Sequence, residues 1–124
     1  MAEERFSMVV FSGTVDKLYP VAIMASGAVA MGMEVDIFVT FWGLQAFRQG
    51  NPAQLARVSK DFEDQAAAFM EVARQKNLPS WYHILRQAKE LGQVRVHACA
   101  MTMDLFGLTQ ADLDPIVDDV VGVG

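Results

Sequence analysis

The sequence predicts an α/β domain with a mostly parallel sheet of four or five strands, covered by helices on both faces as a three-layer sandwich. Short apolar runs rich in β-branched residues alternate along the chain with longer helical patterns. A strand, a helix and a second strand fit within residues 6–41, which indicates a βαβ unit with parallel strands and a right-handed crossover. Apolar residues make up 52% of the 124 residues, enough for one core, so we expect a single domain over residues 1–124.

The first strand and the first helix follow from an apolar run and a segment of small residues. Residues 6–11 (FSMVVF) form the apolar run, and Ser12-Gly13-Thr14 stops it, so we expect a buried strand and a turn. The segment 17–32 is rich in Ala, Gly, Ser and Met. It is predicted to be a helix with Asp16 as its N-cap and Gly32 as its C-cap.

The second strand is expected at residues 34–41 (EVDIFVTF), because its apolar and polar residues alternate. One face carries Val35, Ile37 and Val39, and the other carries Asp36, Phe38 and Thr40. Trp42-Gly43 ends this strand. Helical patterns follow at residues 44–48 and 53–75, and Gly50-Asn51-Pro52 separates them.

In the last third of the chain, the sequence predicts a helix, a strand, two short helical segments and a final strand. We expect Ser80 to cap a helix over 81–91 and Gly92 to end it. The remaining expected elements are a third strand at 94–101, a short helix at 102–106, a helical turn capped by Thr109, and a last strand at 116–123. The first strand is expected near the centre of the sheet, flanked by the strands at 33–41 and 93–100.

Composition excludes several classes of protein. The formal net charge is −5, whereas a nucleic-acid binder needs a basic surplus to neutralise phosphates. The chain has one cysteine, which excludes an internal disulfide and a cysteine-rich zinc module and fits a reducing compartment. The uncharged run at residues 18–33 is shorter than a membrane span, which needs about 20 residues. The N-terminus lacks a secretory signal pattern, so we expect a soluble, cytoplasmic protein without a membrane span.

A functional site in a parallel sheet is expected at the carboxyl ends of the strands. Three segments meet this condition: Ser12-Gly13-Thr14, residues 41–43, and residues 99–102. The first of them lacks the GxGxxG and GxxxxGK[ST] patterns and the Ser/Thr-rich phosphate loop of flavodoxins. We therefore expect no nucleotide or flavin cofactor. The alternative interpretation of Ser12-Gly13-Thr14 is an ordinary turn that connects a strand to a helix.

Cys99 is the candidate reactive residue. It falls near the end of the third strand and just before a short helix, where helix N–H groups favour a thiolate. We expect it at the end of a central strand, beside the turn at Ser12–Thr14. His97 lies two positions earlier, on the same face, and is a candidate to assist proton transfer. The alternative is that Cys99 is a small core residue and that His97 only hydrogen-bonds the backbone.

A soft-metal site is an alternative to this interpretation. His97, Cys99, Met101 and Met103 together have the ligand softness that suits copper. Residues 101 and 103 straddle the expected end of the strand, however, and most of the eight methionines lie on core-like apolar stripes. The sequence therefore predicts no metal site.

Two stretches of the sequence resemble a known family. SGTVDKLYPVAIMASGAVAMGMEVDIFVTFWGL includes residues 38–44, which match an FTFWGL-like segment after the second strand. VRVHACAMTMDLFGL includes residues 98–107, which match an AC-x-M-x-MD-x-G-like segment. In order and separation these stretches are similar to the DsrE/DsrF-like proteins, specifically the DsrE2-type branch, over nearly the whole chain.

The resemblance implies a flavodoxin-like fold and a part in sulfur trafficking. Members of the family carry sulfane sulfur, as a persulfide or thiosulfonate, on a cysteine after a central strand, and the matching residue here is Cys99. They pass it to another protein, for which a TusA-like or rhodanese-like partner is expected. They assemble as trimers, tetramers or hexamers. Met101, Met103 and Trp42 would then shield the carried sulfur.

Two further interpretations stay open beside a sulfur carrier or sulfurtransferase. One is a non-enzymatic oligomeric module that binds a partner or small molecule, with Cys99 structural. The other is a nucleotide- or flavin-binding domain. Self-association is also expected from composition, because eight Phe and two Trp exceed what one small core hides. The segment 42–47 and the valine-rich C-terminus are the candidate interface regions.

Overall fold

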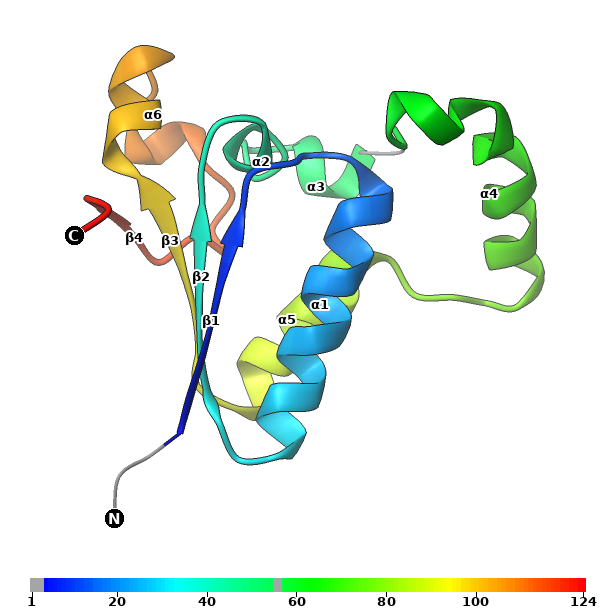
Figure 1. The fold of residues 1–124 in the computed structure, drawn as a ribbon, viewed down its shortest axis with the longest axis horizontal. Coiled ribbons are helices and arrows are strands. Elements are labelled where there is room, and N and C mark those ends of the chain that lie inside the picture. The colour runs from blue at the N-terminus through cyan, green and yellow to red at the C-terminus, as the bar shows by residue number, and fades with distance from the viewer. Residues whose placement is uncertain (1–3, 55–56) are drawn as a thin grey trace.

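The computed structural model, which describes residues 4–54 and 57–124, contains a four-stranded parallel sheet flanked by helices (Figure 1). The strands are β1 (Arg5–Val10), β2 (Glu34–Val39), β3 (Val94–Cys99) and β4 (Asp119–Val121), and they lie side by side in the order β1-β2-β3-β4. Every neighbouring pair is parallel. The predicted α/β class and parallel sheet are confirmed.

The two long helices that cross over between the strands lie together on one face of the sheet (Figure 1). They are α1 (Val15–Ala30), between β1 and β2, and α5 (Trp81–Leu91), before β3. Alternate strand residues point into the core beneath these helices, including Val35, Ile37 and Val39 of β2, as their spacing predicts. Their complete burial contributes about 1.5–3 kcal/mol for each large side chain and holds the sheet against the helices.

Two details of the predicted sheet are wrong. β1 lies at the edge, not near the centre, because β3 pairs with β2 on the side opposite β1. Within the described residues, no long helix covers the second face of the sheet, although helices were expected on both faces (Figure 1). On that face Arg5, Ser7 and Val9 of β1 are exposed. The second face is therefore open along most of its length.

The predicted single helix at residues 53–75 is also wrong. Residues 53–54 end the short helix α3 (Asn51–Gln54), and residues 55–56 lie outside the described residues. After a break at 57–59, the chain forms η1 (Lys60–Gln65) and α4 (Ala66–Gln75). The backbone amide and hydroxyl of Ser59 both donate to the Asp16 carboxylate, at 2.8 and 2.7 Å. These bonds hold Ser59 in an extended conformation (φ −59°, ψ 149°), which interrupts the helical path.

Helix ends follow the predicted signals in part. Ser80 caps α5, because its hydroxyl accepts the His83 amide at 3.0 Å. Gly32 adopts φ +81° just after α1 and so ends that helix as expected. Asp16 is not the N-cap: Thr14 holds that position, and Asp16 lies in the first turn of α1. The capping box of Thr109 and Asp112 confirms the short helical turn, η2 (Gln110–Asp112).

Three short helices gather at the carboxyl end of the sheet (Figure 1). They are α2 (Trp42–Gln45), α3 (Asn51–Gln54) and α6 (Ala100–Leu105). Leu44 and Phe47 are fully buried in the core, so most of the segment 42–47 is not available as the predicted interface. Trp42 is the exception, with 63% of its surface exposed. At the C-terminus Val117 is buried, whereas Val123 is exposed.

Candidate functional site

Cys99 is the last residue of β3, an inner strand, and the N-cap of α6. Its position at the carboxyl end of an inner strand is the one that the sequence predicts. The alternation along β3 directs it to the open face, together with His97. Only 8% of its surface is exposed. Cys99 is therefore buried at the carboxyl end of the sheet.

Two threonine hydroxyls act on the thiol. Thr40 follows β2, Thr102 lies in the first turn of α6, and both lower the pKa of Cys99. Thr40 Oγ1 and Thr102 Oγ1 are 3.0 Å apart, and Thr102 is completely buried. The parallel pairing of β2 and β3 brings these residues together, although they are 62 positions apart in the sequence.

The thiolate form of Cys99 is favoured in this environment. Burial raises the pKa of the thiol, but hydrogen bonds from the Thr102 and Thr40 hydroxyls and from the backbone of Thr102 and Met101 outweigh it. The net effect lowers the pKa of Cys99 below its ordinary value. A thiol with a lowered pKa has more of the nucleophilic form at neutral pH.

The turn after β2 is strained and tightly packed. Phe41 has φ +48° and ψ −122°, a conformation that side-chain-bearing residues rarely adopt and that costs about 1–3 kcal/mol. It directs the Phe41 amide to Thr102 Oγ1, at 3.1 Å. Gly43 allows this turn to approach β1, because a Cβ there would lie 2.2 Å from the Val10 carbonyl oxygen. Strain and close packing together fix the backbone beside Cys99.

The predicted lining residues from the first turn form a separate cavity. Ser12, Gly13, Thr14 and Trp42 line a cavity of about 550 Å³, whose other lining residues are Gln45, Ala46, Asn51 and Arg57. Cys99 is not part of its wall. Gly13 packs against the Trp42 carbonyl oxygen, where a Cβ would come within 2.2 Å. The cavity and the thiol thus share the carboxyl edge of the sheet without forming one site.

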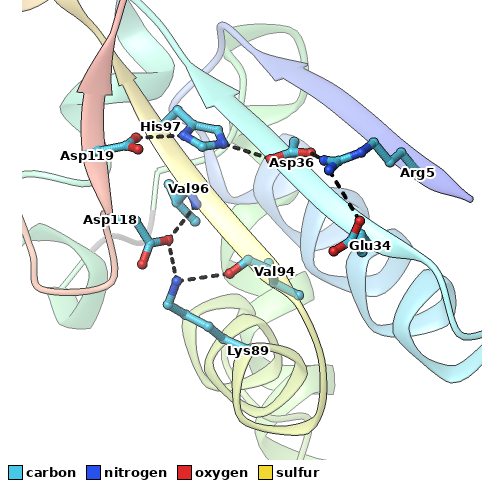
Figure 2. Close-up of polar contacts among 9 residues, drawn as sticks. All are labelled: Arg5, Glu34, Asp36, Lys89, Val94, Val96, His97, Asp118 and Asp119. Carbon is cyan, nitrogen blue, oxygen red and sulfur yellow. Dashed lines mark hydrogen bonds and ion pairs between the residues drawn. The ribbon is translucent and has the colours of Figure 1, made fainter. Parts of the chain in front are cut away.

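His97 is held between two carboxylates, which engage both of its ring nitrogens (Figure 2). Its Nδ1 lies 2.6 Å from Asp119 of β4, and its Nε2 lies 2.8 Å from Asp36 of β2. Burial favours the neutral ring, but the hydrogen bonds to Asp36 and Asp119 outweigh it and raise the pKa of His97. The hydrogen bond from His97 likewise helps to lower the pKa of Asp36.

The polar cluster extends across the open face (Figure 2). Arg5 of β1 forms ion pairs with Asp36 at 2.9 Å and with Glu34 at 3.3 Å. Next to β4, the Asp118 carboxylate accepts a hydrogen bond from the Val96 amide at 2.8 Å. It also forms an ion pair with Lys89 of α5. These contacts tie the short strand β4 to β3.

The two methionines of the predicted site point in different directions. Met103 is buried in the core, whereas Met101 is 73% exposed. Over residues 4–54 and 57–124, no three His, Cys, Asp or Glu side chains gather closely enough to hold a metal ion. The same residues contain no helix with the length and apolar character of a membrane span.

A second hollow lies away from the thiol, between α1 and the η1–α4 segment. It has a volume of about 460 Å³ and mainly apolar walls, which include Tyr19, Ile23 and Phe69. Asp16 lies at its rim, where burial raises the pKa of its carboxyl but hydrogen bonds from Thr14 and Ser59 lower it to about 2. Ser59 occupies that carboxylate through its amide and its hydroxyl.

The fold and the site together define a class of protein: a parallel α/β domain whose one cysteine ends an inner strand and has a lowered thiol pKa. The chain belongs to the DsrE/DsrF/DrsH-like family, whose profile matches residues 2–79 and 54–124. The resemblance read from the two sequence stretches is thereby confirmed.

Individual relatives agree with this assignment. The chain is 32% identical to the uncharacterized protein YrkE of Bacillus subtilis, over 94% of this chain and 84% of that protein. It is 27% identical to the sulfur carrier protein DsrE2 of Allochromatium vinosum, over 90% of this chain and 84% of that protein. Among solved structures it resembles a protein of unknown function from Methanobacterium thermoautotrophicum, MTH1491, with a TM-score of 0.58 and 15% identity, over 96% and 82% of the two chains. That structural likeness concerns the fold.

Proposed function

We propose that this protein is a sulfur carrier or sulfurtransferase that holds sulfane sulfur on Cys99, as a persulfide or thiosulfonate, and passes it to a thiol of a partner protein. The observation that carries the proposal is the environment of the chain's one cysteine. Its sulfur lies at the carboxyl end of an inner strand, and two hydroxyls and two backbone groups favour its thiolate. Family membership and the relative named as a sulfur carrier support the same role.

For a persulfide on Cys99, the chemistry needs one thiolate and no external oxidant. In loading, the Cys99 thiolate attacks the sulfane sulfur of a persulfide donor, a new S–S bond forms, and the donor thiolate leaves with the electron pair. In discharge, an acceptor thiolate attacks the outer sulfur, and the Cys99 thiolate leaves. A second cysteine would compete by forming an internal disulfide, and this chain has none.

Partial burial suits a carrier of this kind. With 8% of Cys99 exposed, burial would shield a carried sulfur from most solvent oxidants. Exposed apolar side chains near the same edge, Phe41, Trp42 and Met101, provide a surface for a partner. We propose a sulfur-carrier partner of the TusA-like or rhodanese-like kind, and a reducing, cytoplasmic location that keeps Cys99 as a thiol.

Mass spectrometry of the intact protein tests loading. After incubation with polysulfide and removal of the excess, the mass is expected to rise by about 32 Da per sulfur atom, the atomic mass of sulfur, and the adduct is expected to disappear on treatment with a reductant. Cys99→Ser is the matched control, because it removes only the sulfur nucleophile. An unmodified native protein, or an adduct that persists in Cys99→Ser, contradicts the proposal.

The second candidate is a non-enzymatic oligomeric module in which Cys99 is structural. The low exposure of Cys99 is the observation that favours it. A thiol that resists alkylation in the native protein but reacts after unfolding would support this candidate over sulfur transfer. Self-association belongs to both candidates, and we propose that copies meet through the open sheet face, where Val9 is 64% exposed. A monomer mass in light scattering at micromolar concentration would contradict self-association.

A further inference from the structure

The cavity at the carboxyl end of β1 is the feature on which this inference depends. Its volume of about 550 Å³ is within the usual range of small-molecule pockets, and the sulfur chemistry proposed for Cys99 does not use it. Ligands of open parallel sheets bind at this end of the strands. The cavity therefore has both the position and the size of a ligand site.

Close packing fixes the segments that border the cavity. A Cβ on Gly13 would lie 2.2 Å from the Trp42 carbonyl oxygen, so the turn after β1 and the start of α2 are in direct contact. The Asn51 side chain of α3 donates to the Gln45 carbonyl at 2.8 Å and so joins α3 to α2. These contacts hold the walls of the cavity together without a ligand.

Arg57 gives the cavity its charge. Among the described residues that line it, Arg57 is the one charged side chain, although the whole chain has a net charge of −5. Its backbone is anchored, because the Arg57 carbonyl accepts the Val15 amide at 2.7 Å. The neighbouring acidic residue, Asp16, borders the other hollow, and its carboxylate accepts two hydrogen bonds from Ser59. A guanidinium in such a concave wall favours an anionic ligand.

Neutral side chains of the wall add hydrogen-bond donors and an apolar surface. Ser12 Oγ and Thr14 Oγ1 are 3.4 Å apart, beyond the usual O–H···O range of about 2.5–3.0 Å, so the Ser12 hydrogen is available to a ligand. Gln45 Oε1 accepts from Arg48 at 3.2 Å, which leaves the NH₂ group of that amide to donate. Trp42 contributes an aromatic ring to the same wall.

We propose that this cavity binds a small organic monocarboxylate, whose carboxylate pairs with the Arg57 guanidinium and whose apolar part lies against Trp42. One cation balances one negative charge, which favours a carboxylate over the several charges of a nucleotide phosphate chain. The first turn also lacks the glycine-rich patterns through which phosphate loops present backbone N–H groups. The site is separate from Cys99 and does not depend on the proposed sulfur chemistry.

Titration of the complete chain, followed by NMR, tests this site. Benzoate and phenylacetate are the probes, added to about 10 mM so that millimolar binding is detected. Benzamide and phenylacetamide have the same shape without the charge. We expect the carboxylates to shift the Trp42 indole N–H signal in a saturable way and the amides to leave it in place. Trp81 is the internal reference, because it is buried in the core.

Three variants assign the binding to the cavity. We expect Arg57→Gln to weaken benzoate binding about tenfold and Ser12→Ala to weaken it about threefold, because each removes a donor to the carboxylate. Arg86→Gln is the matched control, since it removes the same charge at an exposed position of α5 that borders a different hollow. We expect that variant to bind benzoate as the native protein does. Circular dichroism checks that each variant is folded.

Three results would overturn the proposal. The first is the absence of a saturable shift at Trp42 with both carboxylates. The second is binding of the amides as tight as that of the carboxylates, which would remove the anionic ligand class. The third is an equal loss of binding in Arg86→Gln and Arg57→Gln, which would show general attraction of anions. None of these readouts involves Cys99, so failure of the sulfur-carrier function and failure of this site are told apart.

Discussion

The imidazole of His97 on β3 lies 2.6 Å from the Asp119 carboxylate on β4, and this contact joins the last strand to the sheet. A second carboxylate, Asp36, lies 2.8 Å from the other ring nitrogen. Both nitrogens are thus engaged on the open face. The sequence interpretation gave His97 a part in proton transfer to Cys99, whereas this geometry favours a role in holding strands together.

The pH dependence of stability follows from this arrangement. The pKa of His97 is raised in the folded protein, so the charged ring contributes stability below its unfolded pKa, about 6.5. That contribution is lost as the pH rises through the folded pKa. We expect His97→Gln to lower the free energy of unfolding by about 1–3 kcal/mol near pH 6 and by less near pH 9.

Denaturant unfolding at both pH values measures this difference. Arg5 also faces Asp36, and Lys89 pairs with the neighbouring Asp118. His83→Gln is the matched control, because that side chain is exposed on α5 and only its backbone amide is used in the cap. An effect of His97→Gln that is equal at both pH values would refute this explanation.

Close packing of Gly43 predicts a large effect from a single methyl group. In Gly43→Ala the new Cβ would lie 2.2 Å from the Val10 carbonyl oxygen, so the turn or β1 must move. We expect a loss of about 1–3 kcal/mol in the free energy of unfolding and a change in the alkylation rate of Cys99.

The matched control for this substitution is Gly27→Ala, on the exposed side of α1, where a Cβ meets nothing within 4 Å. It is expected to gain about 0.5–1 kcal/mol through helix propensity, with Cys99 reactivity unchanged. Thermal unfolding and alkylation measured together decide the point. Equal stability of the two variants would show that the turn accommodates the methyl group.

The N-cap of α5 supplies a prediction that concerns stability alone. Ser80→Ala removes the hydroxyl that accepts the His83 amide, and we expect it to cost about 1 kcal/mol. Because the cap is not among the contacts of Cys99, the alkylation profile is expected to stay unchanged. Ser26→Ala, at an exposed position within α1, is the control and is expected to lose nothing. A loss in the control as large as in Ser80→Ala would argue against the cap.

Local patterns in the sequence predicted much of the fold. The alternation at 34–39, the cap at Ser80 and the capping box at Thr109 are all decided by neighbours within a few residues, and the structure has them. The lateral order of the strands is not local. β1 alone shows no signal for an edge position, because its place depends on β3 pairing with the far side of β2.

Of the candidate site, the sequence predicted the cysteine but not the residues around it. Cys99 could be found, since a cysteine at the end of a strand and before a short helix is visible in the sequence. Its hydroxyl partners could not, because Thr40 and Thr102 are 62 positions apart and only the pairing of β2 with β3 brings them together. The same holds for His97 and Asp36, which are 61 positions apart. The break at Ser59 was missed because its partner, Asp16, is 43 positions away in the sequence.

The central claim is that Cys99 carries sulfur and gives it up, and direct transfer of labelled sulfur tests it. The protein is loaded with isotopically labelled sulfane sulfur, freed of donor, and mixed with an acceptor protein that has one reactive thiol. Mass spectrometry of tryptic peptides then follows the label. We expect it first on the peptide of Cys99 and later on the acceptor thiol, and on neither when Cys99→Ser replaces the native protein. Label that never enters the Cys99 peptide, or that reaches the acceptor equally fast with Cys99→Ser, would contradict the account.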